Sequence, residues 1–167
     1  MSELRTNRII PRDGLPSGSA GGIIQVKQTV DSATANQQIS GTTYTDAGSL
    51  SVSITPTRSD SKILIMATTN IQAFVSAQEV SGGLRLVRGS SEIIEYPYAF
   101  VMEAGTSGSS RIFYNTNHSA VYLDSPATTS STTYKVQLKT YGTSNNMKLI
   151  YNQNSSKSTI LVMEVSG

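Results

Sequence analysis

The stretch Thr133–Gly142, TYKVQLKTYG, alternates bulky and polar residues without a break. Successive side chains of a β-strand point to opposite faces, so this pattern predicts a strand with one face against a core and the other toward water or a neighbour. The inner face is expected to carry Tyr134, Val136, Leu138 and Thr140. The outer face is expected to carry Lys135, Gln137, Lys139 and Tyr141. The run of Ser, Thr and Ala before it, with Pro126, is typical of a connection whose hydroxyls satisfy the backbone locally.

Similar short alternating runs recur from Ile23 to the end of the chain. They are separated by clusters of Gly, Asn and Ser, and Pro97 predicts an edge strand or a bulge in its run. The runs are GSLSVSITP (48–56), SKILIMATTNIQAF (61–74), GGLRLVRGS (82–90), SEIIEYPYAF (91–100), RIFYNTNHSAVYL (111–123), MKLIYN (147–152) and STILVMEVS (158–166). The sequence therefore predicts an all-β fold of about 8–10 strands, an antiparallel β-sandwich or jelly roll, with a barrel as the alternative.

Composition limits the classes of function. The chain has 167 residues, which is enough for one domain, and it has no cysteine, so disulfides, thiolate metal sites and a Cys nucleophile are excluded. Only 14% of residues are charged and the net charge is +2, which argues against nucleic acid as a partner. The sequence shows no apolar run of the roughly 20 residues that a membrane helix needs, so membrane insertion is not expected.

The first 22 residues differ from the rest. Two prolines and several glycines interrupt any regular element there, while three arginines flank the pair Ile9-Ile10. We expect residues 1–22 to form an extended arm and residues 23–167 to form the β-sandwich domain.

The residues that catalysis would need are sparse. The one histidine, His118, could be combined with Asp124 and a serine, but no local motif marks a nucleophile. Glu92 and Glu95 are the nearest acidic pair, yet neighbouring positions on one strand do not define the two sides of a sugar cleft. The aspartates are scattered singly, unlike those of a carboxylate metal site. We therefore predict a protein that is not an enzyme and has no cofactor, and we assign no residue as a metal ligand.

Tyrosine is the most frequent aromatic residue, with eight copies and no tryptophan. A tyrosine suits places where one end of the side chain is in an apolar contact and the other in water. Tyr96, Tyr98 and Tyr141 are the candidates for contact with a glycan or with another subunit.

Five strings, in order, resemble one group of proteins. They are SELRTNRIIPRDGLPSGSAGGIIQV, LSVSITPTRSDSKILIM, LRLVRGSSEI, LDSPATTSSTTYKVQ and STILVMEVS. Together they look like small tail-fibre-like virion structural proteins of tailed bacteriophages, especially those of marine and freshwater hosts such as cyanophages. The resemblance covers nearly the whole chain.

The resemblance implies a virion protein, assembled in the host cytoplasm, with an attachment arm and a trimeric β-rich head. Its partners would be other copies of itself, a tail or major capsid protein, and a host surface glycan. The residues implied in docking onto the particle are Leu4, Arg5, Arg8, Ile9 and Ile10. Two placements stay open, a tail fibre that attaches to the host and a capsid decoration protein that cements the shell. A free carbohydrate-binding module is the alternative from another class.

Overall fold

The computed structural model describes residues 22–32, 37–75, 79–103, 112–143 and 147–166. The expected docking residues, Leu4, Arg5, Arg8, Ile9 and Ile10, lie outside the described residues, as does nearly all of the expected arm. The first strand begins at Ile23.

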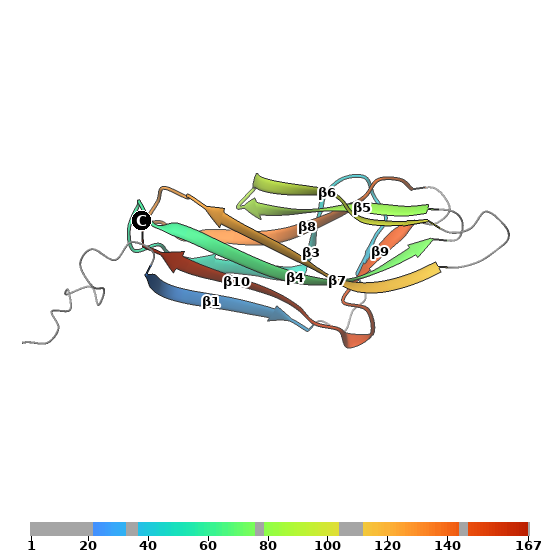
Figure 1. The fold of residues 1–167 in the computed structure, drawn as a ribbon, viewed down its shortest axis with the longest axis horizontal. Coiled ribbons are helices and arrows are strands. Elements are labelled where there is room, and N and C mark those ends of the chain that lie inside the picture. Colours follow the sequence, from blue (N-terminus) through green and yellow to red (C-terminus); the bar gives the residue numbers. More distant parts are fainter. Residues whose placement is uncertain (1–21, 33–36, 76–78, 104–111, 144–146, 167) are drawn as a thin grey trace, which may run out of the picture.

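Ten strands form two antiparallel sheets in the described part of the chain (Figure 1). Sheet A contains β1 (Ile23–Asp31), β2 (Gln37–Ile39), β4 (Lys62–Val75), β7 (Ile112–Asp124), β9 (Lys148–Tyr151) and β10 (Ser158–Val165). Sheet B contains β3 (Thr45–Ile54), β5 (Glu79–Arg88), β6 (Ser91–Glu103) and β8 (Thr132–Thr140). The predicted all-β sandwich is confirmed. Its helical content within the described ranges is one 3-10 turn, η2 (Gln153–Ser155), and none of these residues forms a helix with the length and apolar character of a membrane span.

The order of the strands is that of a jelly roll. Sheet A runs β1-β10-β4-β7 and sheet B runs β3-β8-β5-β6, with β2 and β9 added beside the far half of β4. If the eight long strands are lettered B to I in chain order, the sheets read BIDG and CHEF, the two interlocked Greek keys of that fold. One open side of the sandwich therefore lies between the edge strands β6 and β7.

The core lies between the two sheets and follows the predicted alternation. The inward residues of β8 are buried at every second position, and Val136 and Leu138 have no exposed area. Sheet A supplies Ile63 and Ile65 from β4 and Ile160 from β10, all fully buried. Each such side chain contributes roughly 1.5–3 kcal/mol to folding through burial.

β4 is long enough to pair with two strands along the same edge. Its first half pairs with β10 and its second half with β9. Asn152 makes the transition in the left-handed conformation, with φ of 50°, and its N–H donates to the carbonyl of Asn70 at 3.1 Å. Ser158 Oγ donates to Asn152 Oδ1 at 2.6 Å and accepts from the Asn70 N–H at 2.8 Å, so the Ser158 hydroxyl joins Asn152 and Asn70 at this buried corner.

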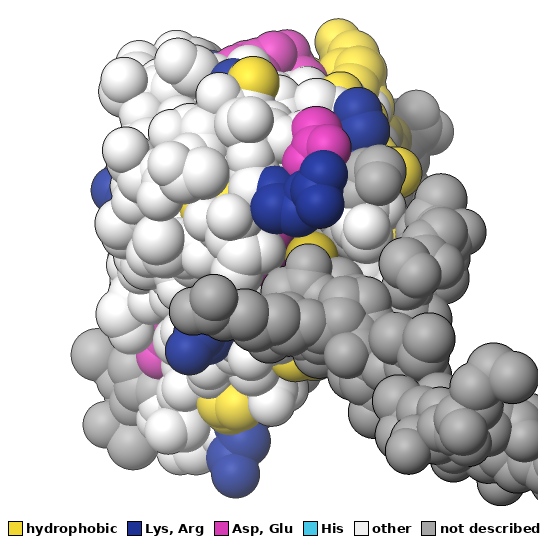
Figure 2. All heavy atoms as spheres, turned by 90° about the vertical axis from the view of Figure 1, so that its left-hand side faces the viewer, with side chains coloured by type: hydrophobic (Ala, Val, Ile, Leu, Met, Phe, Trp, Pro, Cys, Tyr) yellow, Lys and Arg dark blue, Asp and Glu magenta, His cyan; other side chains and the backbone are white. Residues whose placement is uncertain are grey.

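The end of the sandwich seen in Figure 2 is mostly backbone and uncharged polar side chains, with the charged side chains in a few small groups. This surface agrees with the low fraction of charged residues in the chain. The two outer faces of the sheets are less alike, as the following section describes.

Candidate binding face

Tyr98 is placed on the outer surface of sheet B by a bulge in β6. Between the pairs Leu84–Tyr96 and Gly82–Phe100, the strand β6 has three residues where β5 has one. Pro97 lies in this bulge, on an edge strand where its missing N–H is tolerated, which confirms the prediction for Pro97. The next residue, Tyr98, has a φ of 51°, a conformation that costs a non-glycine residue of order 1–3 kcal/mol.

Tyr98 stacks on Tyr141. The two ring centres are 4.3 Å apart and the rings are inclined by 20°. Tyr98 is 61% exposed, so Tyr141 supports one side of its ring while much of the ring remains open to solvent. The bulge and the stack together hold an aromatic ring on the surface in a fixed orientation.

Gly83 makes room for two tyrosine hydroxyls beside this stack. A Cβ atom at Gly83 would lie 2.5 Å from Tyr44 Oη and 3.1 Å from Tyr141 Oη. Any side chain at this position would displace one or both rings. The absence of a side chain in the middle of β5 is therefore what allows Tyr44, from the loop before β3, to reach over the sheet.

Tyr44 also contacts two cations and one carboxylate. Arg85 and the Lys139 ammonium each lie 4.3 Å from the centre of its ring, and Lys139 lies 4.7 Å from the centre of the Tyr141 ring. Tyr44 Oη donates to Glu95 Oε1 at 2.7 Å, and Lys139 Nζ donates to the same oxygen at 3.2 Å. Cation–π contacts and charge-assisted hydrogen bonds thus hold the ring in place.

These contacts shift two pKa values in opposite directions. Burial and the hydrogen bond to Glu95 raise the pKa of Tyr44 above its ordinary value. The hydrogen bonds from Tyr44 and Lys139 lower the pKa of Glu95. At neutral pH the hydroxyl is therefore a donor and the carboxylate an acceptor, which is the arrangement that keeps both in place.

A row of polar side chains continues across sheet B. Gln137 Nε2 donates to Asp46 Oδ1 at 2.5 Å and Lys135 Nζ donates to Asp46 Oδ2 at 2.9 Å. Arg85 Nε donates to Gln137 Oε1 at 2.8 Å, and its NH1 donates to Glu92 Oε2 at 2.9 Å. The outer face of sheet B is thus a network of paired charges, with Tyr98 projecting at its edge. We call this surface, centred on Tyr44, Tyr98, Tyr141, Arg85, Glu95 and Lys139, the tyrosine face.

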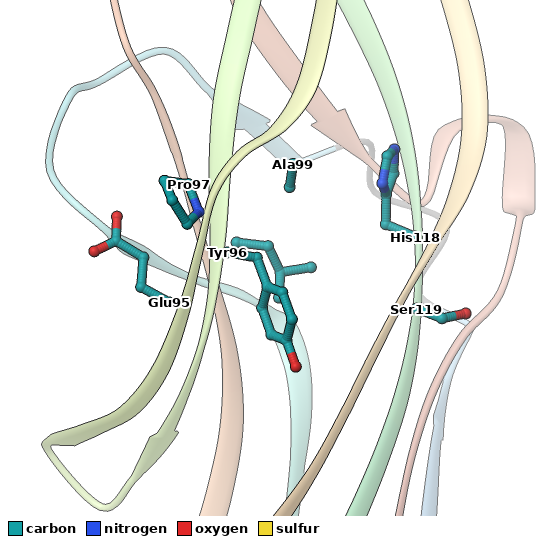
Figure 3. A pocket seen from close by; sticks show the side chains of 7 residues that line it. Glu95, Tyr96, Pro97, Ala99, His118 and Ser119 are labelled. Atoms are coloured by element: carbon teal, nitrogen blue, oxygen red, sulfur yellow. The ribbon is translucent and has the colours of Figure 1, made fainter.

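Tyr96 does not belong to the tyrosine face. Its side chain points to the opposite side of β6, and its hydroxyl donates to the Val121 carbonyl on β7 at 2.9 Å. It lines a cavity of about 350 Å³ between the two edge strands. Figure 3 shows Tyr96 and Ala99 on the β6 side of this cavity and His118 on the β7 side. The structure therefore brings together two of the three predicted tyrosines and separates the third.

His118 lies in this cavity against an aromatic ring. Its ring meets Phe100 edge-on with centres 4.0 Å apart, its Nε2 has no hydrogen-bond partner, and burial lowers its pKa. In Figure 3 the Glu95 carboxylate points away from it. Asp124 lies six residues farther along β7, roughly 20 Å away, since a strand rises about 3.4 Å per residue. A Ser-His-Asp arrangement with these residues is not formed.

Asp124 instead pairs with two residues of neighbouring strands. It is buried, and its two oxygens accept from Arg88 NH1 at 3.0 and 2.8 Å. The Tyr134 hydroxyl donates to Asp124 Oδ2 at 2.8 Å. Burial together with this bond raises the pKa of Tyr134. The contact joins β5, β7 and β8 at one end of the sandwich and has a structural role.

Glu92 and Glu95 are each paired within the tyrosine face, Glu92 with Arg85 and Glu95 with Tyr44 and Lys139. A carboxyl that acts as a general acid needs a raised pKa, whereas that of Glu95 is lowered. Over the described ranges, no three His, Asp or Glu side chains gather as a metal site would require.

The sequence analysis missed Tyr44, Gly83 and Arg85 as parts of this face, whereas it placed Lys139 and Tyr141 correctly on the outer side of their predicted strand. The pair Gly82-Gly83 inside a predicted strand could have indicated this site. Glycine in a strand interior often marks a place where other groups approach the backbone closely. Tyr44 and Glu95 are 51 residues apart, so only the pairing of the strands shows that they meet.

No protein-family model matches the chain, and no curated protein matches it in sequence. Among solved structures, a protein of the T13 infectious bursal disease virus particle is 12% identical, with 98% of this chain and 40% of that chain covered and a TM-score of 0.41. The infectious bursal disease virus VP2 subviral particle gives 13% identity, coverage of 98% and 37%, and a TM-score of 0.39. Latent PorU from Porphyromonas gingivalis gives 9% identity, coverage of 90% and 14%, and a TM-score of 0.37.

This chain thus spans about two fifths of the length of the viral chains it matches. Likeness at these scores assigns neither a family nor a function.

Proposed function

We propose that this chain is a non-enzymatic structural protein of a tailed bacteriophage virion, exposed on the particle as a trimer and anchored by residues 1–22. Within the virion we assign it to a tail fibre, where it contributes to attachment to the host. Its partner on the particle is another virion protein, and its partner on the host is a surface glycan.

The observation that carries this proposal is the exposed ring of Tyr98. A pyranose ring has a face of C–H groups that packs on an aromatic ring while its hydroxyls remain hydrated, which suits a surface tyrosine with one apolar and one wet side. Tyr98 is held in a strained conformation and stacked on Tyr141, so little side-chain freedom remains to be lost on binding. The resemblance of the five sequence strings supplies the virion context.

The placement is tested by imaging intact particles of the phage that encodes the chain, with a gold-labelled antibody against the chain. Label on the tail supports attachment. Label on the shell would replace the tail fibre with the capsid decoration role, and particles without label would contradict both. Removing residues 1–22 is expected to abolish incorporation into particles.

Glycan binding is tested with surface polysaccharide purified from the bacteria that this phage infects. Tyr98→Ala is expected to weaken binding at least about tenfold, the equivalent of roughly 1.4 kcal/mol. Tyr98→Phe keeps the ring and is expected to retain binding. Tyr114, which is 52% exposed on β7, provides a matched control as Tyr114→Ala. Equal binding by Tyr98→Ala and the control would remove Tyr98 from the proposal.

A further inference from the structure

The outer face of sheet A carries apolar side chains in register across four strands. Val26 on β1 pairs with Met163 on β10, Met163 pairs with Leu64 on β4, and Leu64 pairs with Leu123 on β7. Paired residues in a sheet point to the same face, so these four side chains form one continuous row. Val26 and Leu123 are 49% and 53% exposed.

The next row repeats the pattern. Leu161 on β10 pairs with Met66 on β4, and Met66 pairs with Val121 on β7, with Gln28 at the β1 end of the row. Met66 and Val121 are 44% and 53% exposed. On the opposite side of the first row from the second, Ile23 on β1 pairs with Val165 on β10. We call these outward residues of β1, β10, β4 and β7 the apolar face.

The apolar face is separate from the core. The opposite side of the same strands, with Ile63, Ile65, Ile160 and Val162, is fully buried between the sheets. β4 and β10 are therefore apolar on both faces, which is the pattern of strands that are covered on both sides. In this structure only one of those sides is covered by the chain's own described residues.

The size of the apolar face fits the centre of a protein interface. Strands lie about 4.8 Å apart and side chains on one face repeat about every 6.8 Å, so four strands by three rows cover on the order of 400 Å². The largest apolar patch of a typical monomer covers about 300–600 Å² and is often functional, and a stable interface buries about 800 Å² per partner. An apolar centre of this size with a polar rim, such as the row of Thr159 and Thr68, supplies what such an interface needs.

The charge of the apolar face favours a second copy of the same chain as its partner. In these rows of described residues the one ionisable outward side chain is Lys62, at the margin, where Nζ donates to Ser125 Oγ at 2.8 Å. Around a threefold axis, three copies of this face can point toward a common centre without repulsion between like charges. A lipid surface is favoured instead by a basic rim of several Lys or Arg residues, which these rows lack.

We propose that the apolar face is the surface through which copies of this chain associate. The inference rests on the proposed trimer, for which it names the contact, and it is independent of the place of the protein in a virion. The tyrosine face, on the other side of the sandwich, then remains exposed in the assembly.

The test is the mass of the full-length protein in solution, measured by sedimentation and light scattering at micromolar concentration. The wild type is expected to be a trimer. Val121→Glu places a charge in the apolar face and is expected to give a monomer with an unchanged circular dichroism spectrum. Ser53→Glu adds the same charge to an exposed position on the outer face of sheet B and is expected to remain a trimer.

Val121→Thr, a polar variant of nearly the same shape, covers the case in which the glutamate variant fails to fold, and it is expected to raise the dissociation constant at least about tenfold. A wild-type dimer that Val121→Glu dissociates would support the apolar face and contradict the trimer. A monomeric wild type, or an oligomer that Val121→Glu and Val121→Thr leave intact, would overturn the inference. Neither result would bear on the proposed glycan binding, which the experiment with Tyr98→Ala tests separately.

Discussion

The two outer faces of the sandwich are held by opposite kinds of interaction. On sheet B, outward side chains such as Arg85, Glu95 and Lys139 are paired with one another and with tyrosine rings. On sheet A, outward side chains such as Leu64 and Met66 are apolar, and no second layer of the described residues covers them. The first face is complete within one chain, whereas the second leaves apolar surface uncovered. This difference is the reason we propose the apolar face, and not the tyrosine face, as the contact between copies of the chain.

Among the variants, Gly83→Val is expected to lower the stability of the fold most. It disrupts the tyrosine face and leaves the apolar face unchanged. The new side chain would collide with the hydroxyls of Tyr44 and Tyr141. Overpacking of this kind costs about 1–3 kcal/mol, to be measured as a change in the free energy of unfolding in urea. Gly41→Ala is the control, since its nearest atom outside its neighbours is 4.0 Å away. Equal stability of the two variants would mean that Tyr44 is not held as described.

Tyr44→Phe is expected to destabilise the fold by about 1 kcal/mol. It removes the 2.7 Å bond to Glu95 while keeping the ring between Arg85 and Lys139. A hydrogen bond to a charged group contributes more than this when buried, and partial exposure reduces it. The pKa of Glu95, followed by NMR, is expected to rise toward its ordinary value. An unchanged pKa would show that Lys139 alone sets it.

Acid is expected to weaken the contacts within the tyrosine face, while copies of the chain stay associated through the apolar face. Burial acts to raise the pKa of Asp46, but the bonds from Gln137 and Lys135 outweigh it, and the pKa values of Asp46 and Glu95 are both lowered. A carboxyl with a lowered pKa stabilises the folded state above its ordinary pKa, and that contribution is lost as the pH falls through the folded value. The free energy of unfolding should therefore decrease below about pH 4.

The measurement is urea unfolding across this pH range, with the oligomeric mass determined at each pH. Tyr44→Phe should show a shallower decrease in acid than the wild type. Dissociation of the oligomer at the same pH, before the fold is lost, would argue that ionised groups and not the apolar face hold the copies together.

Met66→Ser is expected to have the smallest effect on the stability of a single chain. Met66 is 44% exposed, so the substitution should change the free energy of unfolding of a dissociated subunit by less than about 0.5 kcal/mol. Its effect should appear in the association of subunits, measured by the dependence of the melting temperature on protein concentration. A large loss of stability at low concentration would mean that Met66 packs within its own subunit.

Strand alternation predicted the fold well where one face of a strand is polar. In β8 every second residue is buried as expected, and Pro97 lies in the bulge of an edge strand. Alternation is less informative in β1, because the apolar Val26 points outward whereas the acidic Asp31 is buried. At an edge strand the inner face is filled partly by polar side chains, so hydrophobicity alone does not give its direction.

The two outer faces were harder to predict, and the reasons differ. The tyrosine face joins Tyr44, Arg85, Glu95 and Lys139 from separate parts of the chain, and local patterns do not report such contacts. The apolar face did leave a signal, since KILIM and TILVM in the sequence are apolar at successive positions. Such runs indicate strands covered on both sides, and this signal went unused.

The central claim is that one face is covered by other copies while the opposite face is open. The chain has no cysteine, so Val121→Cys and Ser53→Cys each introduce one thiol, on sheet A and sheet B respectively. The rate of reaction with a maleimide, measured on the assembled protein, tests the claim directly. The account predicts slow labelling at position 121 and rapid labelling at position 53. Equally rapid labelling at both positions would contradict it.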